Sequence, residues 1–98
     1  MPKLSLMFDN KLVREVPVGS RPVTIGRAPD NDLSVDNLAV SSYHAKVYFE
    51  AGRMVIEDLN SLNGTWVNGI RIHPGQHHPL NAGDVVQIGT VQLKLVFG

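Results

Sequence analysis

Apolar and polar residues alternate along this chain in short runs, which is the period of a β-strand and not that of an amphipathic helix. Residues 4–8 alternate in this way, and residues 45–50 place Ala45, Val47 and Phe49 on one face of a half-buried strand. Gly, Pro, Asn and Asp interrupt the runs about every eight to twelve residues, a rhythm typical of sandwiches and barrels. The pattern therefore predicts an all-β protein.

Turn-forming pairs divide the predicted strands into hairpins. Asn68–Gly69 lies between two apolar runs and is the strongest short hairpin signal in the chain. Asp9–Asn10 and Ala51–Gly52 mark two further turns, and Val91 begins a last strand with its side chain on the apolar face. We expect about ten antiparallel strands that close into a two-sheet sandwich. The predicted strands are residues 4–8, 12–16, 22–25, 45–50, 53–58, 65–67, 70–72, 85–88 and 91–97.

Length and composition narrow the class of protein. With 98 residues, 43% of them hydrophobic, the chain is expected to form a single domain over residues 1–98. Its nine basic and nine acidic residues cancel, so no overall basic surplus favours nucleic acid as a partner. The lack of cysteine excludes disulfides, zinc knuckles and thiol catalysis.

The chain also lacks targeting signals. No apolar run reaches the ~20 residues of a membrane span, and no secretory signal follows Met1, so we expect a cytoplasmic location and no membrane partner. Because the last predicted strand runs to the final residue, we expect a piece of a larger signalling or scaffold protein.

Unusual polar residues gather in three connections between predicted strands. These are Gly26–Arg27, Ser41–His44 and Asn60–Thr65, the last of which leads into the Asn68–Gly69 hairpin. Loops on a rigid sandwich are where binding residues usually lie. We therefore expect the function to lie in these loops, at one end of the fold.

The residue types in these loops suit a small anion. Arg27 offers a planar fork of donors, and Ser41 and Ser42 offer hydroxyls. Asn63 offers an amide, and Gly64 permits a positive φ that turns backbone N–H groups inward. The set contains no evident pair of nucleophile and base, so we expect a binding site and not an enzyme.

The order and spacing of these motifs resemble the forkhead-associated domain. The motifs are Gly26–Arg27, Ser41 with His44, Ser61–Thr65 and Val67–Gly69. The resemblance spans nearly the whole chain, and its specificity comes from the ordered set and not from any single motif. It implies an antiparallel β-sandwich of about eleven short strands that recognises phosphothreonine in an extended segment of a partner, without a cofactor.

The resemblance also implies a role for each matching residue. Arg27 and Ser41 would contact the phosphate, and Asn63 would hold the backbone of the partner. His44 would brace the loops from inside, and Asn68 would support its hairpin or touch the peptide. The expected phosphopeptide-binding residues are Arg27, Ser41, Ser42, Leu62, Asn63 and Asn68, and the expected supporting residues are Gly26, His44, Gly64 and Thr65.

Two positions depart from the common pattern of that family. Ser42 stands where many members carry Arg, and Leu62 stands where many carry Thr. Leu62 has no side-chain donor, which leaves its backbone N–H as its possible contribution to phosphate binding. A missing hydrogen bond to a charged group would weaken binding by about tenfold or more.

Other functions remain as alternatives. The departures at Ser42 and Leu62 favour a structural scaffold domain that keeps the fold and works without phosphate. An esterase would need a triad, and the residues available for one are Ser41 or Ser42 with His44 and Asp58. A metal site would draw on His73, His77 and His78, which lie in a connection where we expect no carboxylate support and therefore a solvated loop.

Overall fold

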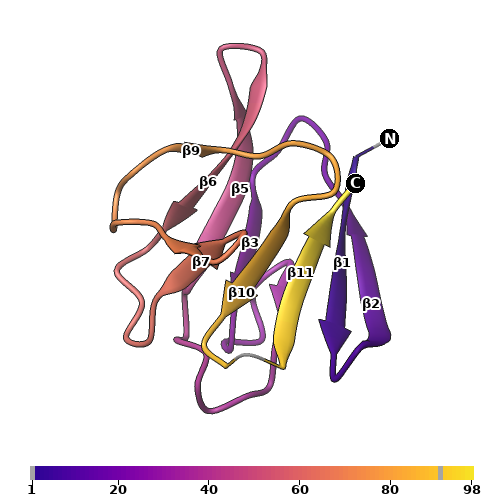
Figure 1. Ribbon diagram of the computed structural model, residues 1–98, viewed down its shortest axis with the longest axis vertical. Coiled ribbons are helices and arrows are strands. Elements are labelled where there is room, and N and C mark those ends of the chain that lie inside the picture. Colours follow the sequence, from indigo (N-terminus) through magenta and orange to yellow (C-terminus); the bar gives the residue numbers. More distant parts are fainter. Residues whose placement is uncertain (1, 91) are drawn as a thin grey trace.

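The computed structural model describes residues 2–90 and 92–98, which form two facing β-sheets (Figure 1). The prediction for Val91 lies outside the described residues. The strands are β1 (Lys3–Phe8), β2 (Lys11–Pro17), β3 (Val23–Gly26), β4 (Leu33–Ser34), β5 (Ala45–Glu50), β6 (Arg53–Asp58), β7 (Thr65–Val67), β8 (Ile70–Arg71), β9 (His78–Pro79), β10 (Val85–Ile88) and β11 (Leu93–Phe97). Among these residues, no helix has the length and apolarity to cross a membrane. The predicted all-β sandwich is confirmed.

The two sheets have the strand orders β2-β1-β11-β10-β7-β8 and β4-β3-β5-β6-β9. The expectation of antiparallel pairing is wrong for one pair of strands, because β4 pairs with β3 in parallel, with Ile25 opposite Leu33. After β3 the chain loops back toward the start of that strand, so that β4 runs beside β3 in the same direction. Asp32 fixes this path by accepting hydrogen bonds from the backbone N–H and the hydroxyl of Thr24. β4 and β9 were not predicted, since two residues are too few to show an alternation and neither strand has the hairpin signal that precedes β8.

Three predicted hairpin turns have the backbone that a type I′ turn requires, with positive φ at both central residues. The φ values are 51° and 65° at Asp9–Asn10, 52° and 79° at Ala51–Gly52, and 50° and 82° at Asn68–Gly69. These turns join β1 to β2, β5 to β6 and β7 to β8. They therefore set the register of three strand pairs from local sequence alone.

The inner faces of both sheets pack into one hydrophobic core. Leu4, Leu95 and Val86 from one sheet and Val47 and Ile56 from the other are fully or almost fully buried. Burying each such side chain contributes about 1.5–3 kcal/mol relative to leaving it in water. The core holds the strand ends rigidly, and these ends carry the functional loops.

The register of the second sheet brings those loops together. Ile25 of β3 lies opposite Ala45 of β5, and Ala45 lies opposite Asp58 of β6. The residues that follow β3, precede β5 and follow β6 are therefore neighbours at one end of the sandwich, which points downward in Figure 1. Three loops that are far apart in sequence thus meet in space.

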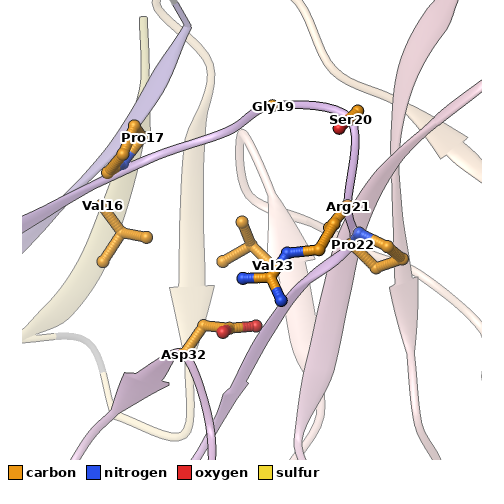
Figure 2. A pocket seen from close by; sticks show the side chains of 8 residues that line it. All are labelled: Val16, Pro17, Gly19, Ser20, Arg21, Pro22, Val23 and Asp32. Carbon is orange, nitrogen blue, oxygen red and sulfur yellow. The ribbon is translucent and has the colours of Figure 1, made fainter.

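Two hollows lie along the side where β2 and β4 form the edges of their sheets. Figure 2 shows the one farther from the functional loops, which encloses about 330 Å³ and has Arg21 and Asp32 reaching into it from different segments. With one cation and one anion, this hollow has no net charge with which to select a charged ligand. The other hollow encloses about 380 Å³.

Candidate functional site

Gly26 and Ser42 bring two of the loops into contact through their backbones. The N–H of Arg27 donates to the carbonyl oxygen of Ser41 (2.9 Å), and that of Ala28 donates to the carbonyl of Ser42 (3.1 Å). A side chain at position 26 would collide with the Ser42 carbonyl oxygen. Gly26 is therefore required by this close approach, which places Arg27 beside the serines.

Ser41 links its own loop to the loop that contains Leu62. The backbone N–H of Leu62 donates to Ser41 Oγ over 2.9 Å. Since a hydroxyl has one proton and accepts through its lone pairs, Ser41 keeps its proton free to donate outward. The same bond occupies the backbone N–H of Leu62, while the Leu62 side chain is 85% exposed.

His44 joins the loops from beneath. Its side chain is fully buried, its Nδ1 accepts the backbone N–H of Ser41 (3.1 Å), and its Nε2 lies 2.9 Å from the carbonyl oxygen of Gly64. Both contacts fit a neutral ring protonated at Nε2. Burial lowers the pKa of His44, while the bond to Gly64 and the nearby charge of Asp58 act in the opposite direction.

Asp58 is a supporting residue that the sequence analysis did not assign to the site. Its buried carboxylate accepts the backbone N–H and hydroxyl of Ser61 and the hydroxyl of Thr65, the last over 2.7 Å. The Ser61 hydroxyl in turn accepts the N–H of Gly64 (3.1 Å). The sequence did contain a signal for this role, namely an aspartate at the end of a strand with a serine three residues later. In this pattern the carboxylate accepts hydrogen bonds from the following turn and orders it.

Arg27 and Ser42 present free donors on the surface. Both residues are exposed, and within the part of the chain that the structure describes neither side chain makes a hydrogen bond or ion pair as a donor. The carbonyl of Ser42 is held by Asn31 Nδ2 (2.8 Å), a second supporting residue absent from the prediction. The guanidinium, the Ser41 proton and the Ser42 hydroxyl therefore belong to loops in direct contact.

Asn63 and Gly64 shape the neighbouring loop. Asn63 Nδ2 donates to the carbonyl of Ala39 (2.8 Å), which ties this loop to the one before β5. Gly64 has a φ of 91°, and a Cβ there would lie 2.9 Å from Nε of Arg71. The Cζ atom of Arg71 also lies 5.4 Å from the centre of the Trp66 ring. Arg71 is exposed, so it is a further cation beside this loop.

Asn68 has its side chain engaged within the protein. Its Nδ2 donates to Asp84 (3.0 Å), and its Oδ1 accepts the backbone N–H of Val85 (2.9 Å). These bonds hold the β7–β8 turn against the start of β10. Of the two roles implied for Asn68, support of the hairpin is the one that this geometry suits.

The residues proposed for a triad do not form one. Ser41 Oγ bonds to the backbone of Leu62, while the His44 ring bonds to two backbone groups and not to a serine hydroxyl. The Asp58 carboxylate bonds to Ser61 and Thr65. This arrangement lacks the bond between nucleophile and base that acyl transfer requires.

Two glutamates lie beside His77. We expected no carboxylate near the remaining histidines, but His77 Nδ1 lies 2.7 Å from Glu50 and its Nε2 lies 3.5 Å from Glu57. The pairing of β5 with β6 brings both glutamates to the outer face of the sheet, beneath this connection. Across residues 2–90 and 92–98, no group of three acidic, His or Cys residues is arranged to hold a metal ion.

A family model described as the FHA domain matches residues 23–89. The ABC transporter ATP-binding/permease protein Rv1747 of Mycobacterium tuberculosis is 37% identical over 97% of this chain and 10% of its own length. The oxoglutarate dehydrogenase inhibitor of Corynebacterium diphtheriae is 39% identical over 80% of this chain and 53% of its own length. The chain thus spans about half or less of these curated relatives.

The fold is also similar to that of solved structures. M. tuberculosis EmbR, solved in complex with a low-affinity phosphopeptide, superposes with a TM-score of 0.80. The two chains are 32% identical, over 97% of this chain and 24% of EmbR.

Proposed function

Because this chain belongs to the forkhead-associated (FHA) domain family, we propose that it is a non-catalytic module that binds a phosphothreonine-containing segment of a partner protein. The observation that carries this proposal is the donor arrangement at Ser41. Its hydroxyl accepts from Leu62 and keeps its proton for an outside acceptor. The adjoining loop presents the Arg27 guanidinium, which has no partner among residues 2–90 and 92–98.

Each donor has a role that its geometry supports. The Arg27 fork matches two phosphate oxygens, and Ser41 donates to a third. Ser42 adds a hydroxyl from the same loop. The Oδ1 of Asn63 accepts a backbone N–H of the partner, since its Nδ2 is engaged with Ala39. Leu62 provides no donor, because its backbone N–H is engaged with Ser41.

The module is proposed to act within a larger protein. The chain matches only part of the length of its relatives, of which one is an enzyme inhibitor and one a transporter protein. We place its parent among cytoplasmic signalling or scaffold proteins, where a kinase-modified partner is available. The EmbR structure supports a phosphopeptide as the ligand class, since that protein was solved with one.

A second function is favoured by the two departures from the family pattern. Exposed Leu62 and the absence of arginine at Ser42 remove donors that a strong phosphate site would use. A scaffold domain that binds without phosphate would tolerate both. The intact set of Arg27, Ser41 and Asn63 favours the first proposal, because a scaffold has no need to keep these donors together.

A peptide library separates the two functions. Random peptides with a central phosphothreonine are screened against the domain beside copies with unmodified threonine. We expect the domain to retain only phosphorylated members. Equal retention of both sets would support the scaffold function and overturn our proposal.

A further inference from the structure

Exposed apolar side chains gather on the β1–β2 hairpin. Phe8, Leu12 and Val13 are 44%, 56% and 55% exposed. Single exposed apolar residues are ordinary, but Phe8 and Val13 both line one hollow, which indicates a contact surface. The hollow in question is the one of about 380 Å³, which we call the β1–β4 crevice. It is lined by Leu6, Phe8, Val13, Arg14, Ser34, Val35, Asp36, Asn37 and Leu93.

A β-bulge turns Val13 into this crevice. Leu6 of β1 pairs with Arg14, but Met7 pairs with Leu12, so Val13 is an extra residue in β2. A bulge at a sheet edge re-aims side chains in this way. Leu12 instead shares the outer face with Met7 and does not line the crevice. Leu12 and Val13 are therefore similarly exposed, but only Val13 lines the crevice.

Hydrogen bonds connect the wall of the crevice to the candidate phosphate site. Ser34 in its wall donates to the carbonyl of Arg27 over 3.5 Å. Asn37 in the same wall accepts the N–H of Ala39 (2.9 Å), whose carbonyl accepts Asn63 Nδ2 (2.8 Å). The crevice wall is therefore bonded directly to Arg27, which is expected to hold the phosphate, and through Ala39 to Asn63, which is expected to hold the partner backbone.

We propose that the β1–β4 crevice binds an apolar side chain of the same partner segment whose phosphothreonine occupies the site at Arg27 and Ser41. This inference rests on the proposed function. A segment anchored by its phosphate presents its next residues at high effective concentration, and an extended chain advances about 3.3 Å per residue. The crevice is then reached within a few residues.

The lining selects the chemistry of that side chain. Arg14 and Asp36 carry opposite charges, and the rest of the lining is mainly apolar, so a charged residue gains nothing there. The volume lies at the lower limit of small-ligand pockets, about 300–1,000 Å³, which suits one leucine or phenylalanine side chain and not a folded element.

A leucine scan tests this inference. Phosphothreonine peptides in a serine and glycine background carry one leucine, placed in turn at each position on either side of the phosphate. They are titrated into wild type, Val13→Ser and the matched control Leu12→Ser. We expect one position at which leucine tightens binding by about tenfold, the size of one buried side chain. The gain should persist in Leu12→Ser and vanish in Val13→Ser, while the leucine-free phosphopeptide binds all three proteins equally.

The contrary outcomes are distinct. No favourable leucine position, or a gain lost equally in both variants, overturns the inference alone. If no phosphopeptide binds wild type, the proposed function fails and this inference with it. A wild-type dimer that Val13→Ser dissociates in sedimentation would assign the crevice to a second copy and also overturn it. If Val13→Ser has a much lower melting temperature than wild type, Phe8→Ser repeats the test, because Phe8 also lines the crevice.

Discussion

Arg27 has a side chain without a partner within the described residues, while its backbone N–H is held by the carbonyl oxygen of Ser41. The backbone position of Arg27 is therefore fixed, while the N–H groups of its guanidinium remain available to a ligand. His44 is the opposite case, since its whole ring is used inside the protein. Substitutions at these two residues should therefore separate binding from stability.

Replacing Arg27 with Ala should remove binding and spare the fold. Affinity for a library-selected phosphopeptide should fall at least about tenfold, as expected for the loss of charge-assisted hydrogen bonds. The free energy of unfolding should change by no more than about 0.5 kcal/mol, because the side chain is exposed. Arg21→Ala, at the other end of the sandwich, is the control and should bind normally. Equal binding by Arg27→Ala would remove this residue from the site.

Replacing His44 with Ala should weaken the fold as well as binding. The change leaves the N–H of Ser41 and the carbonyl of Gly64 without their partner, and we expect a loss of about 3 kcal/mol in the free energy of unfolding. Denaturant unfolding measures this loss, with exposed His73→Ala as the control. Lost binding at unchanged stability would make His44 a ligand and not a brace.

The buried ring also predicts a dependence of stability on pH. Burial lowers the pKa of His44 in the folded protein, while the unfolded chain keeps a value of about 6.5. The unfolded state therefore takes up a proton first as pH falls. The stabilisation is complete above about pH 6.5 and declines as pH drops from there toward the folded pKa. The difference in unfolding free energy between wild type and His44→Ala should narrow over this range, and a widening would contradict the neutral ring.

Leu62→Thr should strengthen binding by supplying a hydroxyl at the departure from the family pattern. We expect a gain of about 1 kcal/mol, or several-fold, because the hydroxyl gives up water to make its bond. Leu38→Thr is the matched control, since Leu38 is 89% exposed in the adjacent loop. Calorimetry at fixed salt measures both variants. If Leu62→Thr binds as wild type does while Arg27→Ala does not bind, the phosphate does not approach residue 62.

At the scale of elements, the β7–β8 hairpin is proposed to support the site without touching the ligand. Asn68→Ala removes two side-chain hydrogen bonds and places Ala at a φ of 50°, so stability should fall by about 1–2 kcal/mol. Affinity should stay within about twofold of wild type at a temperature where both are folded. A large loss of affinity in folded Asn68→Ala would make Asn68 a peptide contact.

The hairpins were the most predictable elements. Each needs only a local signal, and the pairs at Asp9 and Asn68 adopt the turn that their sequence favours. Ala51–Gly52 adopts the same turn although alanine rarely takes a positive φ. β4 and β9 were not predictable, because each is two residues long, pairs with β3 or β6 and, unlike β8, follows no hairpin turn signal. The bulge at Val13 was hidden for the same reason, since it is a property of the pairing with β1.

The site was predictable in its residue types and not in its contacts. The motif order identified Arg27, Ser41 and Asn63, which the register of β3, β5 and β6 brings into adjoining loops. It did not reveal that Ser41 Oγ accepts from Leu62, or that Asp58 orders the turn before Thr65. Those bonds depend on how two loops meet, and a single sequence carries little trace of that.

For the whole molecule, the two ends of the sandwich have different roles. The loops that carry Arg27, Ser41 and Asn63 lie at the lower end in Figure 1. The hollow of Figure 2, with Arg21 and Asp32, lies toward the other end. The net charge of zero gives no general attraction for anions. Binding of a phosphorylated partner should therefore depend on a few donors at one end.

An NMR titration of the domain with a phosphothreonine peptide, and with its unphosphorylated copy, tests this central claim most directly. The account predicts that the phosphopeptide moves the backbone amide signals of residues 26–28, 41–43 and 62–64 and leaves those of residues 19–21 in place. The unphosphorylated copy should move none of them at the same concentration. Equal shifts with both peptides, or shifts confined to the opposite end, would contradict it.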